Sequence, residues 1–241
     1  MTSSISAPAA PSNQRWRYAR ALLLVLGGGM LFALDLLAVT TKTGIAVWDM
    51  PVHNWFLAHR SGAVTWLWES ITTLSSPTYL TILGLVFAAL WAVVRREIWR
   101  PGLLLGGMAL AVAVSFVIKH AVARPRPPAS GFMMGPDDAF SFPSGHTLGA
   151  AVFILALGYL LLSRHPTVWG RIGAVAAAVV LVPAVAASRL YLGYHWLTDV
   201  CGSISLAIAL LGLVIAVDTW QPLRGWSSAE RRRKGWPAPA L

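Results

Sequence analysis

The chain has 241 residues, of which 56% are hydrophobic and only 12% are charged. An ordinary soluble domain carries about 25% charged residues, so this chain lacks the polar side chains that would cover a water-facing surface. The formal net charge of +10 would suggest nucleic-acid binding in a soluble protein, but this composition excludes that class and no nucleic-acid partner is expected.

Six segments are long and apolar enough to cross a membrane as helices, each of which needs about 20 mostly apolar residues. The first is longer than the core of a signal peptide, about 7–15 residues, and is therefore interpreted as an anchor. None has the polar stripe of a soluble bundle helix. The predicted fold class is all-α, an integral membrane bundle of six helices. In chain order the segments cover residues 21–41, 75–94, 101–118, 146–162, 172–188 and 196–217.

The parts outside these spans differ in composition. A membrane domain over residues 18–220 is predicted between two tails, residues 1–17 and 221–241, which are rich in Ser, Ala, Pro or charge and typical of disorder. Residues 42–73 are less apolar and contain four tryptophans. Tryptophans favour the headgroup zone, so an interfacial helix is expected there. Cys201 is the single cysteine, which excludes an internal disulfide, and it is interpreted as a small buried residue.

Basic residues near the span ends predict the orientation, because they are enriched in cytoplasmic loops. Of the 19 basic residues, thirteen fall on the side of both chain ends, so both termini are predicted to be cytoplasmic. These are Arg15, Arg17, Arg20, Arg95, Arg96, Arg100, Arg164, Arg171, Arg224, Arg231, Arg232, Arg233 and Lys234. The other six are Lys42, Arg60, Lys119, Arg124, Arg126 and Arg189.

A basic cluster follows the third predicted span. It contains Lys119, His120, Arg124 and Arg126, with prolines that end the helix. One interpretation is a basic rim that touches lipid headgroups. The other is an anion clamp, because lysine supplies a point charge and arginine a planar fork of donors that matches phosphate.

A second polar cluster opens the fourth predicted span with Pro143, Ser144, Gly145 and His146. A serine at a helix start is a common cap, so a structural interpretation is available. A helix N-terminus beside a glycine also presents free N–H groups to an anion. A histidine at this position can give a proton to the group that leaves the anion.

The third cluster lies where the last predicted span begins. His195 and Asp199 are four residues apart and therefore face the same side of a helix, and Ser188 and Arg189 precede them. A helical His–Asp pair is often structural. A carboxylate one turn away can also fix the imidazole tautomer and leave the other nitrogen free to attack. All three clusters fall at the non-cytoplasmic ends of predicted helices, so bundling can bring them together.

At these residues the sequence resembles the type-2 phosphatidic acid phosphatase superfamily, which includes lipid phosphate phosphatases and the related vanadium-dependent haloperoxidases. The family motifs are Lys, six residues and Arg-Pro; Pro-Ser-Gly-His; and Ser-Arg, five residues, His, three residues and Asp. Every specified position is present in order. The matching residues are Lys119, Arg126 and Pro127; Pro143, Ser144, Gly145 and His146; and Ser188, Arg189, His195 and Asp199.

The resemblance implies a catalytic role for three of these residues. His195 would attack phosphorus and carry a phosphohistidine intermediate, Asp199 would orient His195, and His146 would protonate the leaving alkoxide and then activate water. No cofactor and no metal are implied, and no cluster has metal-ligand spacing. The residues that would hold the phosphate are Lys119, Arg126, Ser144, Gly145 and Arg189.

The expected function is hydrolysis of a lipid phosphate or diphosphate at the outer face of the plasma membrane, among membrane lipids. The expected substrates are a prenyl diphosphate, as for undecaprenyl-diphosphatase-like members of the family, phosphatidic acid or phosphatidylglycerol phosphate. A phosphotransferase is an alternative, in which His195 passes phosphate to an acceptor other than water. Haloperoxidase activity is disfavoured, because those relatives are soluble.

A lipid transporter or a non-catalytic binder on the same scaffold is a different class. Transport is disfavoured because the polar residues gather at one side instead of the bilayer midplane, and a binder because no motif position is missing. The sequence leaves open the lipid tail, the oligomeric state and the roles of Asp35, His120, Arg124 and residues 42–73. The histidines outside the motifs are interpreted as surface or interfacial, with His120 the strongest exception; they are His53, His59, His120 and His165.

Overall fold

The computed structural model describes residues 12–220, and every regular element in that range is a helix. Six of these helices are long and apolar enough to cross a membrane. The predicted fold class, an all-α membrane bundle of six helices, is confirmed. The six helices are α1 (Ser12–Thr41), α4 (Pro77–Arg95), α5 (Trp99–Val122), α6 (Gly145–Leu162), α7 (Val168–Tyr191) and α8 (Leu197–Trp220).

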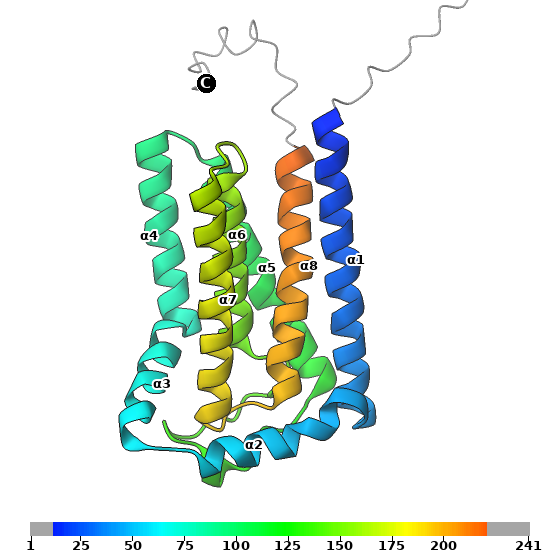
Figure 1. Ribbon diagram of the computed structural model, residues 1–241, viewed down its shortest axis with the longest axis vertical. Helices are drawn as coiled ribbons and strands as arrows, with labels where there is room; N and C mark the ends of the chain where they lie inside the picture. Colours follow the sequence, from blue (N-terminus) through cyan, green and yellow to red (C-terminus); the bar gives the residue numbers. More distant parts are fainter. Residues whose placement is uncertain (1–11, 221–241) are drawn as a thin grey trace, which may run out of the picture.

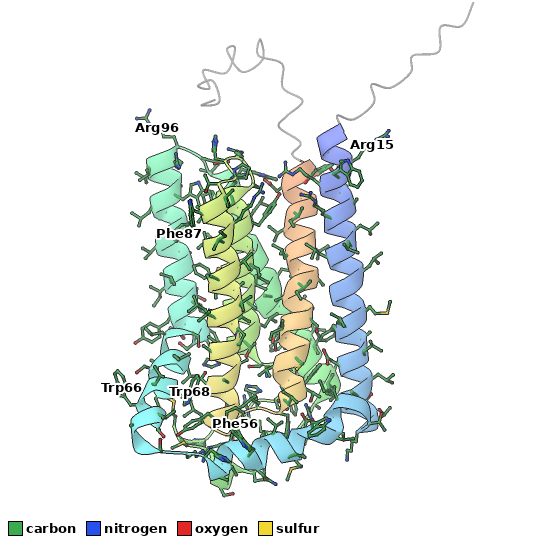
Figure 2. All side chains as sticks on the ribbon, viewed as in Figure 1. Arg15, Phe56, Trp66, Trp68, Phe87 and Arg96 are labelled. Atoms are coloured by element: carbon green, nitrogen blue, oxygen red, sulfur yellow. The ribbon has the colours of Figure 1, made fainter. Side chains whose placement is uncertain are left out.

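Three short helices connect α1 to α4, and another short turn precedes α6. Figure 1 shows α2 crossing one end of the bundle and α3 turning back towards α4, whereas both ends of the described chain lie at the opposite end. Trp66 and Trp68 lie at the α2–α3 end (Figure 2), where an interfacial helix was expected. The short helices are η1 (Gly44–Trp48), α2 (Asp49–Ala58), α3 (Gly62–Leu74) and η2 (Ala129–Gly131).

α6 is the central helix, because it packs against α4, α5, α7 and α8. Leu148, Ala151 and Leu160 of α6 are almost completely buried and belong to the two largest apolar clusters. The outer helices expose aliphatic side chains, such as Leu23 of α1 and Val179 of α7, as expected for faces that contact lipid. The N-terminus of α6 is therefore surrounded by the ends of its neighbours.

α1 lies against α8, and their backbones approach closely at two glycines. A Cβ atom at Gly28 would lie 2.5 Å from the backbone nitrogen of Ala209, and one at Gly212 would lie 2.6 Å from the carbonyl oxygen of Ala21. Small residues permit this kind of contact between membrane helices. This contact holds the first described helix, α1, against the last, α8.

Several helices extend beyond the predicted spans. α1 begins at Ser12 instead of residue 21, α5 continues to Val122 instead of 118, and α7 continues to Tyr191 instead of 188. Charged side chains lower the hydropathy of these terminal turns, so a search for apolar runs stops short of them. Lys119 and Arg189 therefore project from the last turns of α5 and α7.

The basic residues at the start of α1 and in the α4–α5 and α6–α7 connections lie at one end of the bundle, since consecutive spans run in opposite directions. Figure 2 labels Arg15 and Arg96 at this end. Residues 1–11 and the predicted tail of residues 221–241, which holds five of the basic residues, lie outside the described residues. The assignment of this end to the cytoplasm stays a prediction.

Candidate active site

The three polar clusters of the sequence meet at the end of the bundle where α2 and α3 lie. Arg126, after α5, lies 3.1 Å from His195 Nε2, just before α8. The backbone nitrogen of Ser144, before α6, donates to the carbonyl oxygen of Asp199 at 3.3 Å. Lys119 of α5 donates to the carbonyl oxygens of Phe140 and Ser141, which precede Ser144. Residues from three distant parts of the chain therefore form one site.

The α7–α8 turn places His195 at the centre of the site. Gly193 adopts φ 87° in this turn, a conformation that glycine tolerates best. His195 Nδ1 donates to Asp199 Oδ2 at 3.1 Å, and the backbone nitrogen of Trp196 donates to the same oxygen at 2.9 Å. Arg126 Nη1 donates to Nε2, so the lone pair of Nε2 points towards a cation.

Burial and neighbouring cations keep His195 neutral. Burial lowers its pKa well below the ordinary value of 6.5, and the positive charges of Arg189, Arg126 and Lys119 lower this pKa further. A neutral imidazole whose Nδ1 is protonated has its reactive lone pair on Nε2. The surroundings therefore favour the form that acts as a nucleophile.

Arg126 is held in place by groups on both sides of its guanidinium. Its Nε donates to the carbonyl oxygen of Ala139 at 2.7 Å, and its Nη1 donates to that of Tyr194 at 2.8 Å. Asp137 forms an ion pair with Nη2 at 2.7 Å. The fork of donors is therefore fixed beside His195.

Arg189 is 4% exposed, and its charge lies inside the site. One nitrogen, Nη1, donates to Thr72 Oγ1 at 2.7 Å, and the guanidinium carbon lies 4.5 Å from the ring centre of Tyr194. Its buried Nε has no hydrogen-bond partner among the described residues. A buried donor without a partner is costly, and a bound anion would satisfy it.

The second cluster provides the start of α6. Ser144 is the N-cap, and its buried Oγ accepts hydrogen bonds from the backbone nitrogen and the hydroxyl of Thr147, at 3.5 and 3.1 Å. Ser203 of α8 donates to the carbonyl oxygen of Ser144 at 3.0 Å. A Cβ at Gly145 would meet no atom within 4 Å, so open space adjoins the first N–H groups of the helix. Such groups bind anions well.

His146 is half-buried and lies within electrostatic range of Arg189, His195, Arg126 and Lys119. Within residues 12–220 its imidazole makes no hydrogen bond, which leaves both ring nitrogens available. The structure thus brings all the site residues predicted from the sequence into one neighbourhood. Their individual roles stay predictions.

Two residues of the site, Arg124 and Asp49, were not assigned from the sequence. Arg124 Nη1 donates to Asp199 Oδ1 at 2.5 Å, and its Nη2 donates to Asp49 Oδ2 at 2.6 Å. Asp49, at the start of α2, also accepts from the backbone nitrogen of Thr198 at 2.9 Å. Arg124 therefore links two buried carboxylates, one of which is bound to His195. Its signal was its place within the first cluster, whereas Asp49 lies in a segment without a motif.

Thr72 and Asp137 were also missed. Asp137 was detectable as one of only two acidic residues between the first and second motifs, whereas nothing in the sequence marked Thr72. His53 was predicted to be surface or interfacial, and the surface interpretation is wrong: it is 3% exposed, and its ring centre lies 5.5 Å from that of Trp196.

The roles of Asp35 and His120 were left open by the sequence, and the structure shows what each side chain contacts. Asp35 faces α8 inside the bundle and accepts a hydrogen bond from Ser205 at 3.0 Å. His120 is exposed, and its Nδ1 contacts the carbonyl oxygen of Phe116 in its own helix at 2.8 Å. Within the described part of the chain, neither side chain forms a hydrogen bond or an ion pair with a motif residue.

An apolar groove of about 920 Å³ runs between α4, α5 and α6. Leu80, Met108 and Val112 contribute to its walls, and it reaches Lys119 and Gly145 at the site. Pockets of this size accommodate drug-sized ligands. A lipid chain in this groove would place its headgroup beside the cationic residues.

No group of three or more His, Cys, Asp or Glu side chains within residues 12–220 is arranged to hold a metal ion. The positive charges near His195 belong instead to lysine and arginine side chains.

The chain is similar to known proteins in both sequence and fold. Residues 100–222 match the family described as the PAP2 superfamily. The chain is 29% identical over 194 residues to phosphatidylglycerophosphatase B of Bacillus subtilis, which covers 78% of this chain and 92% of that protein. It is 31% identical over 136 residues to a decaprenylphosphoryl-5-phosphoribose phosphatase of Mycobacterium tuberculosis, which covers 55% of this chain and 70% of that protein. The crystal structure of a transmembrane PAP2-type phosphatidylglycerolphosphate phosphatase from Bacillus subtilis has a TM-score of 0.72 and 27% identity, and the match covers 81% of this chain and 97% of that one.

Proposed function

The chain belongs to the PAP2 superfamily of membrane lipid phosphatases, and from this premise we propose that it hydrolyses a lipid phosphate or diphosphate through a phosphohistidine on His195. The observation that carries the proposal is the environment of the imidazole. Nδ1 is bound to Asp199, Nε2 faces Arg126, and further cations lie within electrostatic range. This is the arrangement that a nucleophile for an anionic phosphoryl group requires.

The first chemical step is an in-line displacement at phosphorus. The Nε2 lone pair of His195 forms the N–P bond while the P–O bond to the leaving group breaks. The negative charge of the bound phosphate offsets the cations near His146, so the His146 imidazole takes up a proton in the complex and gives it to the leaving oxygen. Asp199 stabilises the positive charge that develops on the imidazole. The phosphoryl oxygens take the place of Nε2 as acceptors of Arg126, and Arg189 and Lys119 share the spreading negative charge.

The second step releases inorganic phosphate. His146, now neutral, accepts a proton from water, and the hydroxyl oxygen attacks phosphorus as the N–P bond breaks. The electron pair returns to Nε2, which restores the starting form of His195. His146 thus acts as a general acid in the first step and as a general base in the second.

The substrate class follows from the groove. Its apolar walls end at Lys119 and Gly145, so an acyl or prenyl chain in the groove presents its phosphate to the site. We include prenyl diphosphate, phosphatidic acid and phosphatidylglycerol phosphate as substrates. The names of the two relatives, one for a glycerolipid and one for a prenyl lipid, support this range.

We place the site at the non-cytoplasmic face of the plasma membrane. The end of the bundle opposite the site carries eight basic residues in the described part, against six at the site end. The sequence that follows α8 adds five more basic residues within residues 221–241. Cytoplasmic loops carry such an excess. Four of the six basic residues at the site end, Lys119, Arg124, Arg126 and Arg189, make the contacts described above. Arg60 donates to the carbonyl oxygens of Tyr191 and Gly131. These contacts explain why basic residues occur at this end.

We further propose that the reaction needs no metal ion or other cofactor, because Lys119, Arg126 and Arg189 supply the positive charge around the phosphoryl group.

The test is phosphate release by the purified full-length protein in detergent with excess EDTA. The substrates are the prenyl and glycerolipid phosphates named above. We expect release to persist in EDTA and to fall by several orders of magnitude in His195→Ala and Arg189→Ala. Near-normal phosphate release by either variant would show that the active site is wrongly assigned.

The transfer alternative and the binding alternative give different results in the same assay. A phosphotransferase would release more lipid product than inorganic phosphate when an alcohol acceptor is present. A transporter or binder would release phosphate from none of the substrates. The hydrolase proposal predicts equal amounts of the two products with and without acceptor.

A further inference from the structure

A second groove lies at the end of the bundle opposite the candidate active site. It has a volume of about 860 Å³ and is lined by residues of α1, α6, α7 and α8. α6 packs against α7 and α8, and α8 packs against α1, so the groove lies between α1 and α7 over the α6–α8 pair. It shares no lining residue with the groove that reaches Lys119.

The body of this second groove is apolar. On α6 it extends over residues 154–162, which rise by about 12 Å at about 1.5 Å per residue. Half of a hydrocarbon core of about 30 Å is about 15 Å thick, so the groove covers most of the depth of one leaflet. The apolar side chains along it are Leu23, Leu24, Ile154, Leu155, Leu162, Val175, Leu211 and Ile215.

Three arginines belong to the lining of the same groove, at the ends of α1 and α7. Arg17 is paired with Asp218 at 2.9 Å, so its charge is balanced within the protein. Arg20 and Arg171 are exposed and form no ion pair with a residue in the described range. Trp16, which is 68% exposed, also lines this end, and tryptophan favours the headgroup zone. The groove thus combines a chain-sized apolar floor with two unbalanced cations.

We propose that this groove binds a phospholipid with an anionic headgroup, whose negative groups contact Arg20 and Arg171 and whose acyl chain lies along α6. The arginine fork matches phosphate oxygens, and the apolar floor explains why a lipid and not a soluble anion is the ligand. α6 has 18 residues and is about 27 Å long. This lipid therefore lies in the other leaflet from the candidate active site and is not its substrate.

The arginine charges and the apolar floor contribute independently to lipid affinity, and different variants test each contribution. A basic residue near an anionic membrane surface strengthens binding by about 5-fold, so loss of both arginines weakens it by about 30-fold. Arg20→Gln and Arg171→Gln remove the charges at exposed positions. Ala178→Phe, or Leu24→Trp as an alternative, fills the floor and keeps both charges. Arg95→Gln with Arg96→Gln is the matched control, because these exposed arginines lie at the same end outside the groove.

The experiment is native mass spectrometry of the full-length protein in detergent, titrated with phosphatidylserine or phosphatidylcholine of the same acyl chains. We expect the first phosphatidylserine to bind more tightly than phosphatidylcholine. We also expect phosphatidylserine binding to weaken by about 30-fold in Arg20→Gln/Arg171→Gln, with a smaller preference over phosphatidylcholine. Binding should weaken in either filled variant, and the Arg95→Gln/Arg96→Gln control should match the wild type.

Equal affinity for the two lipids in the wild type would overturn the proposal. An equal loss in the Arg95→Gln/Arg96→Gln control would also overturn it, since the cations would then act as a general basic surface. Unchanged binding in both filled variants would show that no acyl chain occupies the groove. None of these measurements depends on phosphatase activity, so the proposal stands or falls apart from the proposed reaction.

Discussion

The imidazole of His195 is fixed at both ring nitrogens, by Asp199 at Nδ1 and by Arg126 at Nε2. The motif spacing predicted the first of these contacts, because residues four apart share a helix face. It did not predict that Arg124 holds the other oxygen of Asp199, or that Asp49 balances Arg124. Such contacts join residues more than 70 positions apart, so the spacing of residues within one motif cannot predict them.

We expect Arg124 to act as a positioning residue through Asp199. A hydrogen bond to a charged group contributes about 1.5–3 kcal/mol, so loss of the bond should reduce kcat by about 10- to 150-fold. KM should change little, because both terminal nitrogens of Arg124 are already bound to the carboxylates of Asp199 and Asp49. The measurement is steady-state hydrolysis by Arg124→Lys, Arg124→Gln and Asp49→Asn.

The charge-retaining variant separates positioning from folding. Breaking a buried ion pair can cost about 3–5 kcal/mol of stability, so thermal unfolding is followed for each variant. Arg124→Lys keeps the charge and should recover part of kcat at near-normal stability. A rise in KM with normal kcat in that variant would contradict a positioning role and point to contact with substrate.

The protonation of His195 gives a pH prediction at the same scale. Its pKa is lowered well below 6.5, first by burial and then by the charges of Arg189, Arg126 and Lys119. Because the lowered pKa favours the neutral form, the reactive lone pair stays available as the pH falls through 6.5. Histidine-selective ¹⁵N NMR, with His195→Ala used to assign the signal, should show a neutral ring from about pH 8 to about pH 5.5. A titration centred near the ordinary value would contradict the described environment.

α2 is the element that connects the membrane interface to the site. Its first residue, Asp49, accepts a hydrogen bond from the backbone nitrogen of Thr198 at 2.9 Å, so the starts of α2 and α8 are joined. Tryptophans in the sequence predicted an interfacial helix in this region. They could not predict its contact with Arg124, because that contact depends on how α2 crosses the bundle (Figure 1).

The packing of α1 on α8 gives a matched pair of glycine variants. A Cβ at Gly28 would lie 2.5 Å from the backbone of Ala209, whereas a Cβ at Gly27 would meet nothing within 4 Å. Gly28→Ala should therefore destabilise the protein by about 1–3 kcal/mol through overpacking. Gly27→Ala should be neutral or stabilising, since alanine is the better helix former. Thermal unfolding in detergent compares them, and an equal response would contradict the described α1–α8 contact.

The whole molecule has one end rich in basic residues and an opposite end that contains the site. A reporter that functions only in the cytoplasm should be active when it is fused after Leu241, because the excess of basic residues favours that side. A second reporter, which functions only outside the cytoplasm, should be active when it is inserted at Ser61 in the α2–α3 connection. The reverse pattern would place the site in the cytoplasm and would leave its chemistry unchanged.

The extent of sequence prediction also differs with scale. The six spans and the three clusters followed from hydropathy and spacing, and the fold class is confirmed. The ends of α1, α5 and α7 were misplaced, because charged residues occur inside their terminal turns. The convergence of the clusters was inferred from topology alone, whereas the contacts of Thr72, Asp137 and Asp49 required the three-dimensional packing.

The most direct test of the central claim is to trap the covalent intermediate. The full-length protein is mixed with a lipid substrate labelled with ³²P at its terminal phosphate, and the reaction is stopped in alkali, where phosphohistidine is stable. We predict that label bound to the wild-type protein maps to His195 and is absent in His195→Ala. Turnover in the wild type without any protein-bound label, or label on a residue other than His195, would contradict the account.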